Sequence, residues 1–352
     1  MSGTAEIEPR VEPLDLELKR PFRISHGVST VRNNAVVIAG PYAGEAALPP
    51  YYDTTVDDVA RYVSGLDLSF LTKPDPFPIA SILSRLPEGP PAAMAAVDMA
   101  IHDAWGQRLG YPLYQLWGLD GRLSKPSSYA QSIPENLDEW KHTLKELQGY
   151  PFLKLKLGSG DPAFDVDIVR IAREHYGGRL AVDANAGWSI PEAVEILPRL
   201  TAYNLEFVEQ PISFDDADDW HLLRRLLKSH EVPLIADESV RTVDDVIGLY
   251  GAADGVNLKL AKCGGLRRVR CLADVARSLG MKLMLGCMIE SSLALTAAAH
   301  VASLFDYLDL DAMLYLADDP FTGLTFHQGY LTLPSGNGLG AVRRNSGSWP
   351  NV

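Results

Sequence analysis

The sequence predicts an α/β protein in which a parallel βα barrel follows an N-terminal α+β domain. From residue 126 onward, short apolar runs alternate with helical stretches, and strands separated by helices form parallel sheets. Eight such units over about 190 residues favour a barrel over an open sheet. The full chain of 352 residues is also too long for one small core.

The first part of the chain mixes strands and helices. Residues 14–22 and 34–40 have the pattern of strands. Residues 54–65 and 91–109 have the pattern of helices, and the second is rich in alanine. We therefore expect residues 1–122 to form a compact α+β capping domain.

The second part of the chain carries the barrel, which we assign to residues 123–319. Helical segments at 164–176 and 191–200 separate some of its strands. The tail, 320–352, has strand and turn character, and we expect it to pack back on the capping domain and complete it. The eight expected strands are SSYAQSI, FLKLKL, RLAVDAN, LEFVEQP, PLIADES, DGVNLKL, KLMLGC and FDYLDLD.

Composition and charge narrow the class of protein. The net charge of -13 argues against nucleic-acid binding, which needs clustered basic residues. The N-terminus lacks the apolar run of a signal peptide, and no apolar stretch has membrane-spanning length. The three cysteines have no metal-type spacing, so a reducing cytoplasmic location is expected.

Two lysines lie inside an apolar strand. Lys154 and Lys156 are two residues apart, so both ammonium groups project from one face of the strand FLKLKL. Like charges this close disfavour each other, and burial disfavours both. A lone lysine in a strand is usually a solvated surface residue, so the pair needs a chemical reason.

Further charged residues close the strands that follow. The steps from Lys156 to these residues are 27, 26, 28 and 22, each about one strand plus one helix. A barrel would bring all of them to one mouth, at the carboxyl ends of its strands, where such folds hold their active sites. These residues are Asp183, Glu209, Asp237 and Lys259.

The three carboxylates predict a metal site. Asp183, Glu209 and Asp237 would repel one another if left alone, and a hard divalent cation removes that repulsion. Oxygen ligands with open positions suit Mg²⁺. Each acid alone could be a helix cap, but their occurrence on successive strands favours Mg²⁺ binding.

The lysines around this site predict proton transfer. A cation and a neighbouring ammonium both lower the pKa of a lysine, so Lys154 and the metal could make Lys156 available as a base. Lys259 could supply a proton from the opposite face. The metal would stabilise the enediolate that forms when a carbon next to a carboxylate loses its proton.

The motifs KLK, VDAN, EQP, ADES and NLKLAKCGG, in this order, resemble the enolase superfamily. The resemblance spans nearly the whole chain and implies a modified TIM barrel, (β/α)7β, under an N-terminal lid domain. Lysines on the second and sixth strands resemble the muconate-lactonizing subgroup. The DLD motif, after MIES at 288–291, is similar to that of dipeptide epimerases, where Asp309 and Asp311 would bind the substrate's α-ammonium.

The resemblance implies a Mg²⁺-dependent epimerase, a member of the racemases and epimerases acting on amino acids and their derivatives. It would invert the α-carbon of the C-terminal residue of an L,L-dipeptide by two-base 1,1-proton transfer. Asn185 and Glu238 are expected to orient the lysines and metal ligands. His26 and Glu290 are the remaining candidates for substrate contact, whereas Lys262 is expected to be a surface or loop lysine.

Two segments resemble lid loops of this family, residues 21–30 and 44–55. In Ala-Glu epimerases the segment that corresponds to residues 21–30 carries an arginine that binds the substrate's glutamate side chain. In this chain Gly27 aligns with that arginine. We therefore expect an apolar or small C-terminal side chain. Arg23 and Arg32 lie nearby, and a contact from either is left open.

Two other readings remain open. One is another reaction of the subgroup, such as that of an o-succinylbenzoate synthase, an N-succinylamino acid racemase or a muconate cycloisomerase. The synthase and the cycloisomerase would have no use for the acidic DLD pair. The other is a catalytically silent metal-binding or scaffold protein, against which the complete set of bases and ligands argues. A homo-oligomer is also possible.

Overall fold

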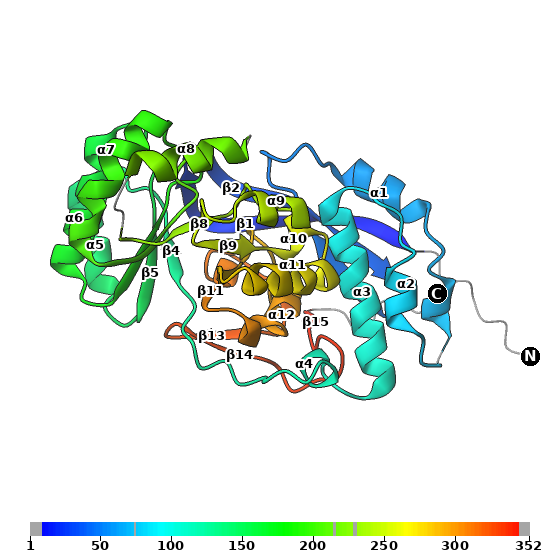
Figure 1. Cartoon of the computed structure of the whole chain (residues 1–352). Helices are drawn as coiled ribbons and strands as arrows, with labels where there is room; N and C mark the ends of the chain where they lie inside the picture. The colour runs from blue at the N-terminus through cyan, green and yellow to red at the C-terminus, as the bar shows by residue number, and fades with distance from the viewer. Residues whose placement is uncertain (1–8, 74, 214–215, 228–230, 345–352) are drawn as a thin grey trace, which may run out of the picture.

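The computed structural model describes residues 9–73, 75–213, 216–227 and 231–344 (Figure 1). Its centre is a parallel sheet with the strand order β11-β10-β9-β8-β7-β6-β5-β4, so the strands follow one another in chain order. The eight strands correspond to the eight expected runs. They are β4 (Tyr129–Gln131), β5 (Phe152–Lys156), β6 (Arg179–Asp183), β7 (Leu205–Glu209), β8 (Leu234–Ala236), β9 (Gly255–Leu258), β10 (Lys282–Gly286) and β11 (Tyr307–Asp309).

The two ends of this sheet meet and nearly close the barrel. Ser127, just before β4, forms a parallel bridge with Leu308 of β11. The Ser128 N–H donates to the Leu308 carbonyl at 2.8 Å. Helical crossovers separate the eight strands. In the described chain a short 3₁₀ helix, Ala312–Leu314, but no α-helix, lies between β11 and the tail strands. The expected modified barrel, (β/α)7β, is therefore confirmed.

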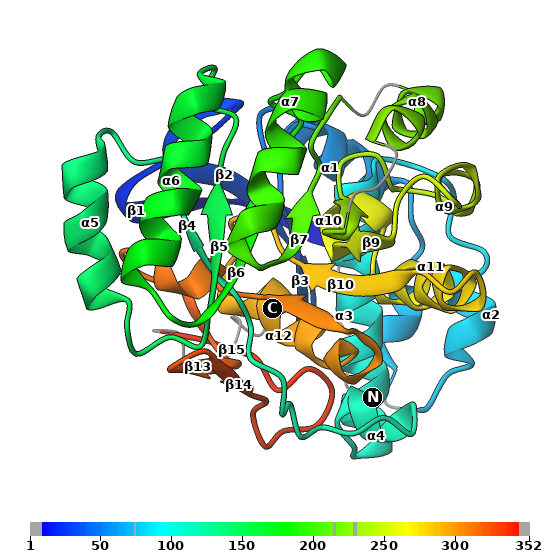
Figure 2. The same cartoon turned by 60° about the vertical axis from the view of Figure 1, so that its left-hand side comes forward.

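Helices surround the strands, as the run from α5 to α7 shows in Figure 2. Local signals start several of them, since Ser189 with Glu192 and Thr242 with Asp245 form capping boxes. The barrel helices are α5 (Leu137–Glu146), α6 (Pro162–His175), α7 (Ile190–Leu200), α8 (Ala217–Leu227), α9 (Val243–Gly248), α10 (Leu260–Cys263), α11 (Leu266–Ser278) and α12 (Ser292–Ala299).

Alternation along β5 explains how lysines fit an apolar strand. Leu153 and Leu155 belong to the main core, between the strands and the helices. Phe152 belongs to a separate cluster with Phe207 and other residues from neighbouring strands, and this cluster fills the amino-terminal end of the barrel. Lys154 and Lys156 share the parity of Phe152 and therefore point into the barrel above that apolar plug.

The capping domain begins with an antiparallel sheet of β1 (Arg10–Ile24), β2 (Gly27–Ala39) and β3 (Tyr42–Ala46). Gly44 packs so closely on α3 that a Cβ atom there would lie 1.9 Å from the Ala96 carbonyl oxygen. Strand β3 was not predicted, and it includes the start of the segment expected to be a lid loop, so only the later part of that segment is loop. The helices are α1 (Val56–Ser64), α2 (Ile79–Leu83), α3 (Pro91–Leu109) and α4 (Leu113–Leu116).

The tail contacts both the capping domain and the barrel. Its Gly338 N–H donates to the Tyr111 carbonyl at 3.0 Å, and the Leu339 N–H donates to Asp103 of α3 at 2.8 Å. No helix in the described part of the chain has the length and apolar composition needed to span a bilayer. The tail strands are β12 (Phe321–Thr322), β13 (Thr325–His327), β14 (Tyr330–Thr332) and β15 (Val342–Arg343).

Candidate active site

A layer of charged side chains lies at the carboxyl ends of the barrel strands. Lys156 is the register partner of Asp183, and Asp183 is the partner of Glu209 on the next strand. The carboxylates of Asp183, Glu209 and Asp237 are completely buried. The barrel thus brings together residues that the sequence separates by whole strand–helix units.

Lys154 and Lys156 each pair with a carboxylate, so their two ammonium groups do not lie side by side without a counter-charge. Lys156 Nζ lies 2.6 Å from Asp183 Oδ2. Lys154 Nζ lies 2.9 Å from Glu209 Oε2 and also donates to Asp309. Burial by itself would lower the pKa of Lys154, but Asp309, Glu209 and Asp183 together raise it well above its ordinary value. The protein's own groups therefore keep Lys154 protonated.

Lys259 approaches from the opposite side of the mouth. Its Nζ lies 2.6 Å from Asp237 Oδ2. Burial would lower its pKa, but Asp237 and further groups including Tyr51 raise it well above the ordinary value. The protein's own groups therefore keep Lys259 protonated, because the acids outweigh burial.

Lys262 is not the surface or loop lysine that the sequence analysis expected. Its side chain is fully buried, and its Nζ lies 3.0 Å from Asp237 Oδ1. The ammonium also donates to the carbonyls of Asp237, Val240 and Asn257. The short helix α10 folds back under the strand end, so a residue past the strand still reaches the core of the site.

The oxygen atoms around Asp237 suit a hard cation. Both of its carboxylate oxygens lack a hydrogen bond of good geometry, although two lysines lie within ion-pair distance. Asn185 Oδ1 and Glu238 Oε2 are also buried without a hydrogen-bond partner. Such orphaned oxygens are what a divalent cation would satisfy, so the donor set fits Mg²⁺.

The same carboxylates do not yet converge on one point. No three acidic, histidine or cysteine side chains among the described residues form a cluster of metal-binding geometry. Their oxygens pair with lysines instead, as Asp183 does with Lys156. The repulsion between the acids is still evident, since burial and the charge of Asp183 help to raise the pKa of Glu209 to about 8.

Asn185 and Glu238 lie beside the candidate metal ligands, where the sequence analysis expected groups that orient them. The Asn185 amide donates to Asp183 Oδ2 and to Glu238 Oε1, both at 3.2 Å. Asn185 itself has a positive φ of 44°, a conformation that asparagine adopts more readily than most residues. The bent backbone holds its side chain between Asp183, at the end of the preceding strand, and Glu238 of a neighbouring loop.

Asp309 and Asp311 line one wall of the mouth. Asp309 accepts from Ser128 and from Lys154. Asp311 Oδ2 accepts from the Ala130 N–H at 2.6 Å and from the Tyr315 hydroxyl. Burial and the charge of Asp309 raise the pKa of Asp311 to about 7. A cation placed here would relieve the repulsion between the two acids.

The capping domain covers the mouth with the turn between β1 and β2. Ser25 Oγ donates to the Asn185 carbonyl at 2.6 Å, which ties the turn to the barrel. His26 is exposed at the tip, and its ring stacks on Tyr51 with 5.0 Å between centroids. Gly27 has a φ of 127°, a conformation open mainly to glycine, and no atom lies within 4 Å of where its Cβ would be.

A small cavity of about 60 Å³ lies between the cap and the barrel mouth. Met288 and Ile289 line it, but the expected Glu290 does not. Glu290 is buried beside this wall, and burial together with the charge of Glu45 raises its pKa to about 8. Polar residues around the cavity are Arg32, Tyr51, Lys156, Asn185, Lys259, Asp309, Asp311 and Tyr315.

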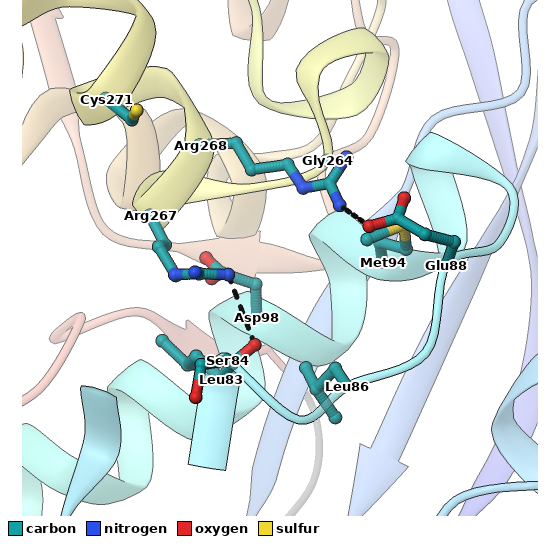
Figure 3. Close-up of a pocket in the computed structure, with 10 residues that line it drawn as sticks. All are labelled: Leu83, Ser84, Leu86, Glu88, Met94, Asp98, Gly264, Arg267, Arg268 and Cys271. Atoms are coloured by element: carbon teal, nitrogen blue, oxygen red, sulfur yellow. Dashed lines mark hydrogen bonds and ion pairs between the residues drawn. The ribbon is translucent and has the colours of Figure 1, made fainter. Parts of the chain in front are cut away.

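A larger cavity, of about 380 Å³, lies away from this site between α3 and α11 (Figure 3). The two arginines that line it already have partners within the protein, since Arg268 pairs with Glu88 and Arg267 donates to the Leu83 carbonyl. Cys271 stands at its edge, without a partner acid or base in the group drawn. This cavity carries no set of groups comparable to the barrel mouth.

Sequence reasoning missed several polar residues of the site, among them Asn257 and Tyr315. Asn257 Nδ2 donates to Glu209 Oε1 at 2.6 Å, and Tyr315 donates to Asp311. Asn257 lies two residues before Lys259, so the same alternation that placed the lysines could have found it. Tyr315 lies in an irregular segment after the last strand, where no local pattern gives its direction.

Comparison with known proteins identifies the family of this chain. Residues 138–345 match the family described as enolase C-terminal domain-like. The L-Ala-D/L-Glu epimerase of Bacteroides thetaiotaomicron is 34% identical over 94% of this chain and 86% of its own. The hydrophobic dipeptide epimerase of Roseobacter litoralis is 38% identical over 70% of this chain and 71% of its own.

A solved structure extends the likeness to three dimensions. The dipeptide epimerase of Cytophaga hutchinsonii, complexed with Mg and the dipeptide D-Ala-L-Val, superposes with a TM-score of 0.84. It is 28% identical, and the match covers 97% of this chain and 96% of that one. From its barrel, its lysines and acids and these relatives, the chain belongs to the enolase superfamily, where its close relatives are named as dipeptide epimerases.

Proposed function

We propose that this protein is a Mg²⁺-dependent dipeptide epimerase that inverts the α-carbon of the C-terminal residue. The observation that carries the proposal is the meeting of Lys156 and Lys259 with Asp309 and Asp311 around one cavity. Two lysines from different strands offer a base and an acid, and two acids offer a site for an ammonium group. The names of the close relatives support the same activity.

The lysines would move the proton. One of them, as a neutral amine, accepts the proton from the α-carbon, and the electron pair of the broken C–H bond moves into the adjoining carboxylate group. The other lysine, as an ammonium, gives its proton to the opposite face of the same carbon. Lys156 and Lys259 exchange these roles for the reverse reaction, so no net proton is consumed.

The acids would hold the rest of the substrate and the cation. Asp183, Glu209 and Asp237 would bind Mg²⁺, which supplies positive charge where negative charge grows on the substrate carboxylate. Asp309 and Asp311 would accept hydrogen bonds from the substrate's α-ammonium, and charge-assisted bonds of this kind are stronger than neutral ones.

Deuterium uptake from D₂O tests the two-base assignment. With Lys156→Ala, uptake from one stereoisomer of a dipeptide should stop while slower uptake from the other persists, and Lys259→Ala should give the mirror result. Neither variant should complete epimerisation, because the proton must leave one face and return on the other. Lys282→Ala, at an exposed lysine at the start of β10, is the matched control and should behave as wild type.

The outcomes separate the competing readings. Near wild-type epimerisation by either lysine variant would refute the two-base assignment. Equal turnover of free and N-acetylated dipeptides would refute the role of Asp309 and Asp311, since acetylation removes the ammonium they would bind. No exchange with any dipeptide, together with turnover of N-succinylamino acids, would replace the proposed function with the racemase alternative.

A further inference from the structure

Arg32 enters the substrate cavity from the capping sheet. On β2, Val36 and Ile38 pack with the core cluster of the barrel, whereas the intervening Ala35 and Val37 pack with the helices of the cap. Arg32 has the parity of Val36 and Ile38, so it faces the barrel. It lines the same cavity as the two lysines and the acid pair.

The Arg32 guanidinium is buried without an acidic partner. Only 8% of the residue is exposed, and no carboxylate of the described residues lies within ion-pair distance of it. Its nearest electrostatic neighbour is the Tyr51 phenol, and burial is the main effect on its pKa, which it lowers. A buried charge without a counter-charge is costly, so such groups are normally paired.

The two lysines that line the cavity already have acidic partners. Lys156 pairs with Asp183, Lys259 pairs with Asp237, and Asp309 accepts from Lys154. Arg32 is therefore the one cationic side chain lining this cavity, among the described residues, that has no acidic partner within ion-pair distance. A guanidinium prefers a carboxylate, which it can bind through two parallel hydrogen bonds.

We infer that Arg32 is a specificity residue that binds a side-chain carboxylate on the C-terminal residue of the substrate. This rests on the proposed function, in which the α-carboxylate belongs to the metal and the ammonium to Asp309 and Asp311. Arg32 then needs a further negative charge on the substrate, besides the α-carboxylate. Tyr51 interacts electrostatically with both Arg32 and Lys259, and all three side chains line the same cavity.

This inference is the alternative to the apolar or small side chain expected from Gly27, and the comparison of substrates decides between the two. The sequence argument sought an arginine at one position of the first lid segment. The structure offers a guanidinium from five residues further along, where β2 runs beneath the lid and alternation turns the side chain into the cavity. A positive charge can thus reach a cavity from a neighbouring strand position without any arginine at the aligned one.

The test compares substrates that differ only in charge. The kcat/KM for deuterium uptake is measured for L-Ala-L-Glu, its uncharged isostere L-Ala-L-Gln, and the reversed peptide L-Glu-L-Ala. Wild type should prefer L-Ala-L-Glu over L-Ala-L-Gln by about 10- to 100-fold, because the amide leaves the guanidinium unpaired. In Arg32→Met this ratio should fall to about one, and Arg32→Lys should retain part of it.

Arg23→Met is the matched control, because Arg23 is an exposed arginine that lies 3.9 Å from Glu135 and lines a different surface. It should leave the substrate ratio unchanged. Three outcomes would each overturn the inference. Wild type could turn over the two isosteres at equal rates, it could prefer L-Glu-L-Ala, or Arg23→Met could abolish the ratio in place of Arg32→Met. The wild-type comparison decides even if Arg32→Met fails to fold. No exchange with any dipeptide would contradict the proposed function itself.

Discussion

Lys262 illustrates how one side chain sets the charge of its neighbours. Its ammonium makes hydrogen bonds to three backbone carbonyls and lies beside the Asp237 carboxylate, entirely away from solvent. Burial would raise the pKa of Asp237, but Lys259 and Lys262 together hold it well below its ordinary value. Lys262 thus keeps a candidate metal ligand ionised while its own position is fixed by the backbone.

We predict that Lys262→Met destabilises the fold. The change removes the donor to three carbonyls and one of the two ammonium partners of the Asp237 carboxylate, and breaking a buried ion pair costs about 3–5 kcal/mol. Urea unfolding measures the loss. Lys141→Met, at a half-exposed helical lysine, should change the free energy of unfolding by less than about 0.5 kcal/mol. A loss below about 1 kcal/mol for Lys262→Met would show that the buried pair is not stabilising.

At the scale of elements, His300 joins three parts of the chain. It caps the C-terminal end of α12, its Nδ1 accepts from the Tyr114 N–H of α4 at 3.4 Å, and its Nε2–H donates to the Leu339 carbonyl of the tail at 3.0 Å. One nitrogen accepts and the other donates, so the ring is bonded in its neutral form. Burial lowers the pKa of His300 to about 4.

This contact predicts a loss of stability in acid. Above pH 6.5 the histidine is neutral in both the folded and the unfolded chain, so its protonation does not change the free energy of unfolding there. As the pH falls from 6.5 to about 4, only the unfolded chain takes up the proton, and the free energy of unfolding falls by up to about 3 kcal/mol. Below about pH 4 this contribution levels off.

Urea unfolding between pH 4 and 7 measures this contribution. His300→Gln should flatten the pH profile of the unfolding free energy over that range, because glutamine does not titrate. His142→Gln, at an exposed histidine on α5, should keep the wild-type slope. A wild-type slope in His300→Gln would show that other groups cause the acid sensitivity.

At the scale of the whole molecule, the candidate active site is shared between the barrel and the cap. Asn34 of β2 donates to Glu45 of β3 and to the Ile289 carbonyl of the barrel, at 2.8 and 3.0 Å. Glu45 in turn accepts from Ser291. These buried bonds fix the cap over the strand ends, so the barrel supplies the lysines and acids while the cap supplies Arg32 and Tyr51.

We predict that Mg²⁺ stabilises the folded protein. A ligand that binds only the folded state adds about 2.7 kcal/mol at a concentration one hundred times its Kd. Thermal unfolding with and without Mg²⁺ measures the shift, and NaCl at equal ionic strength controls for screening. Asp237→Asn should fold but lose the Mg²⁺-dependent shift. An equal shift in wild type and Asp237→Asn would contradict the assignment of this residue as a ligand.

The sequence by itself determined the barrel, the order of its strands and the inward direction of Lys154 and Lys156. These follow from alternation and from the strand–helix repeat, which are local properties of the chain. The spacing of Asp183, Glu209 and Asp237 likewise follows from that repeat.

Only the tertiary structure decided which polar residues outside the strand ends belong to the site. Lys262 follows its strand and is still buried, because α10 folds back on Asp237. Arg32 is far from the barrel in sequence. It enters the cavity because one face of β2 packs on the cap helices, whereas the other face, which carries Arg32, packs on the barrel. Burial and counter-charge depend on contacts between distant segments, and no local period encodes them.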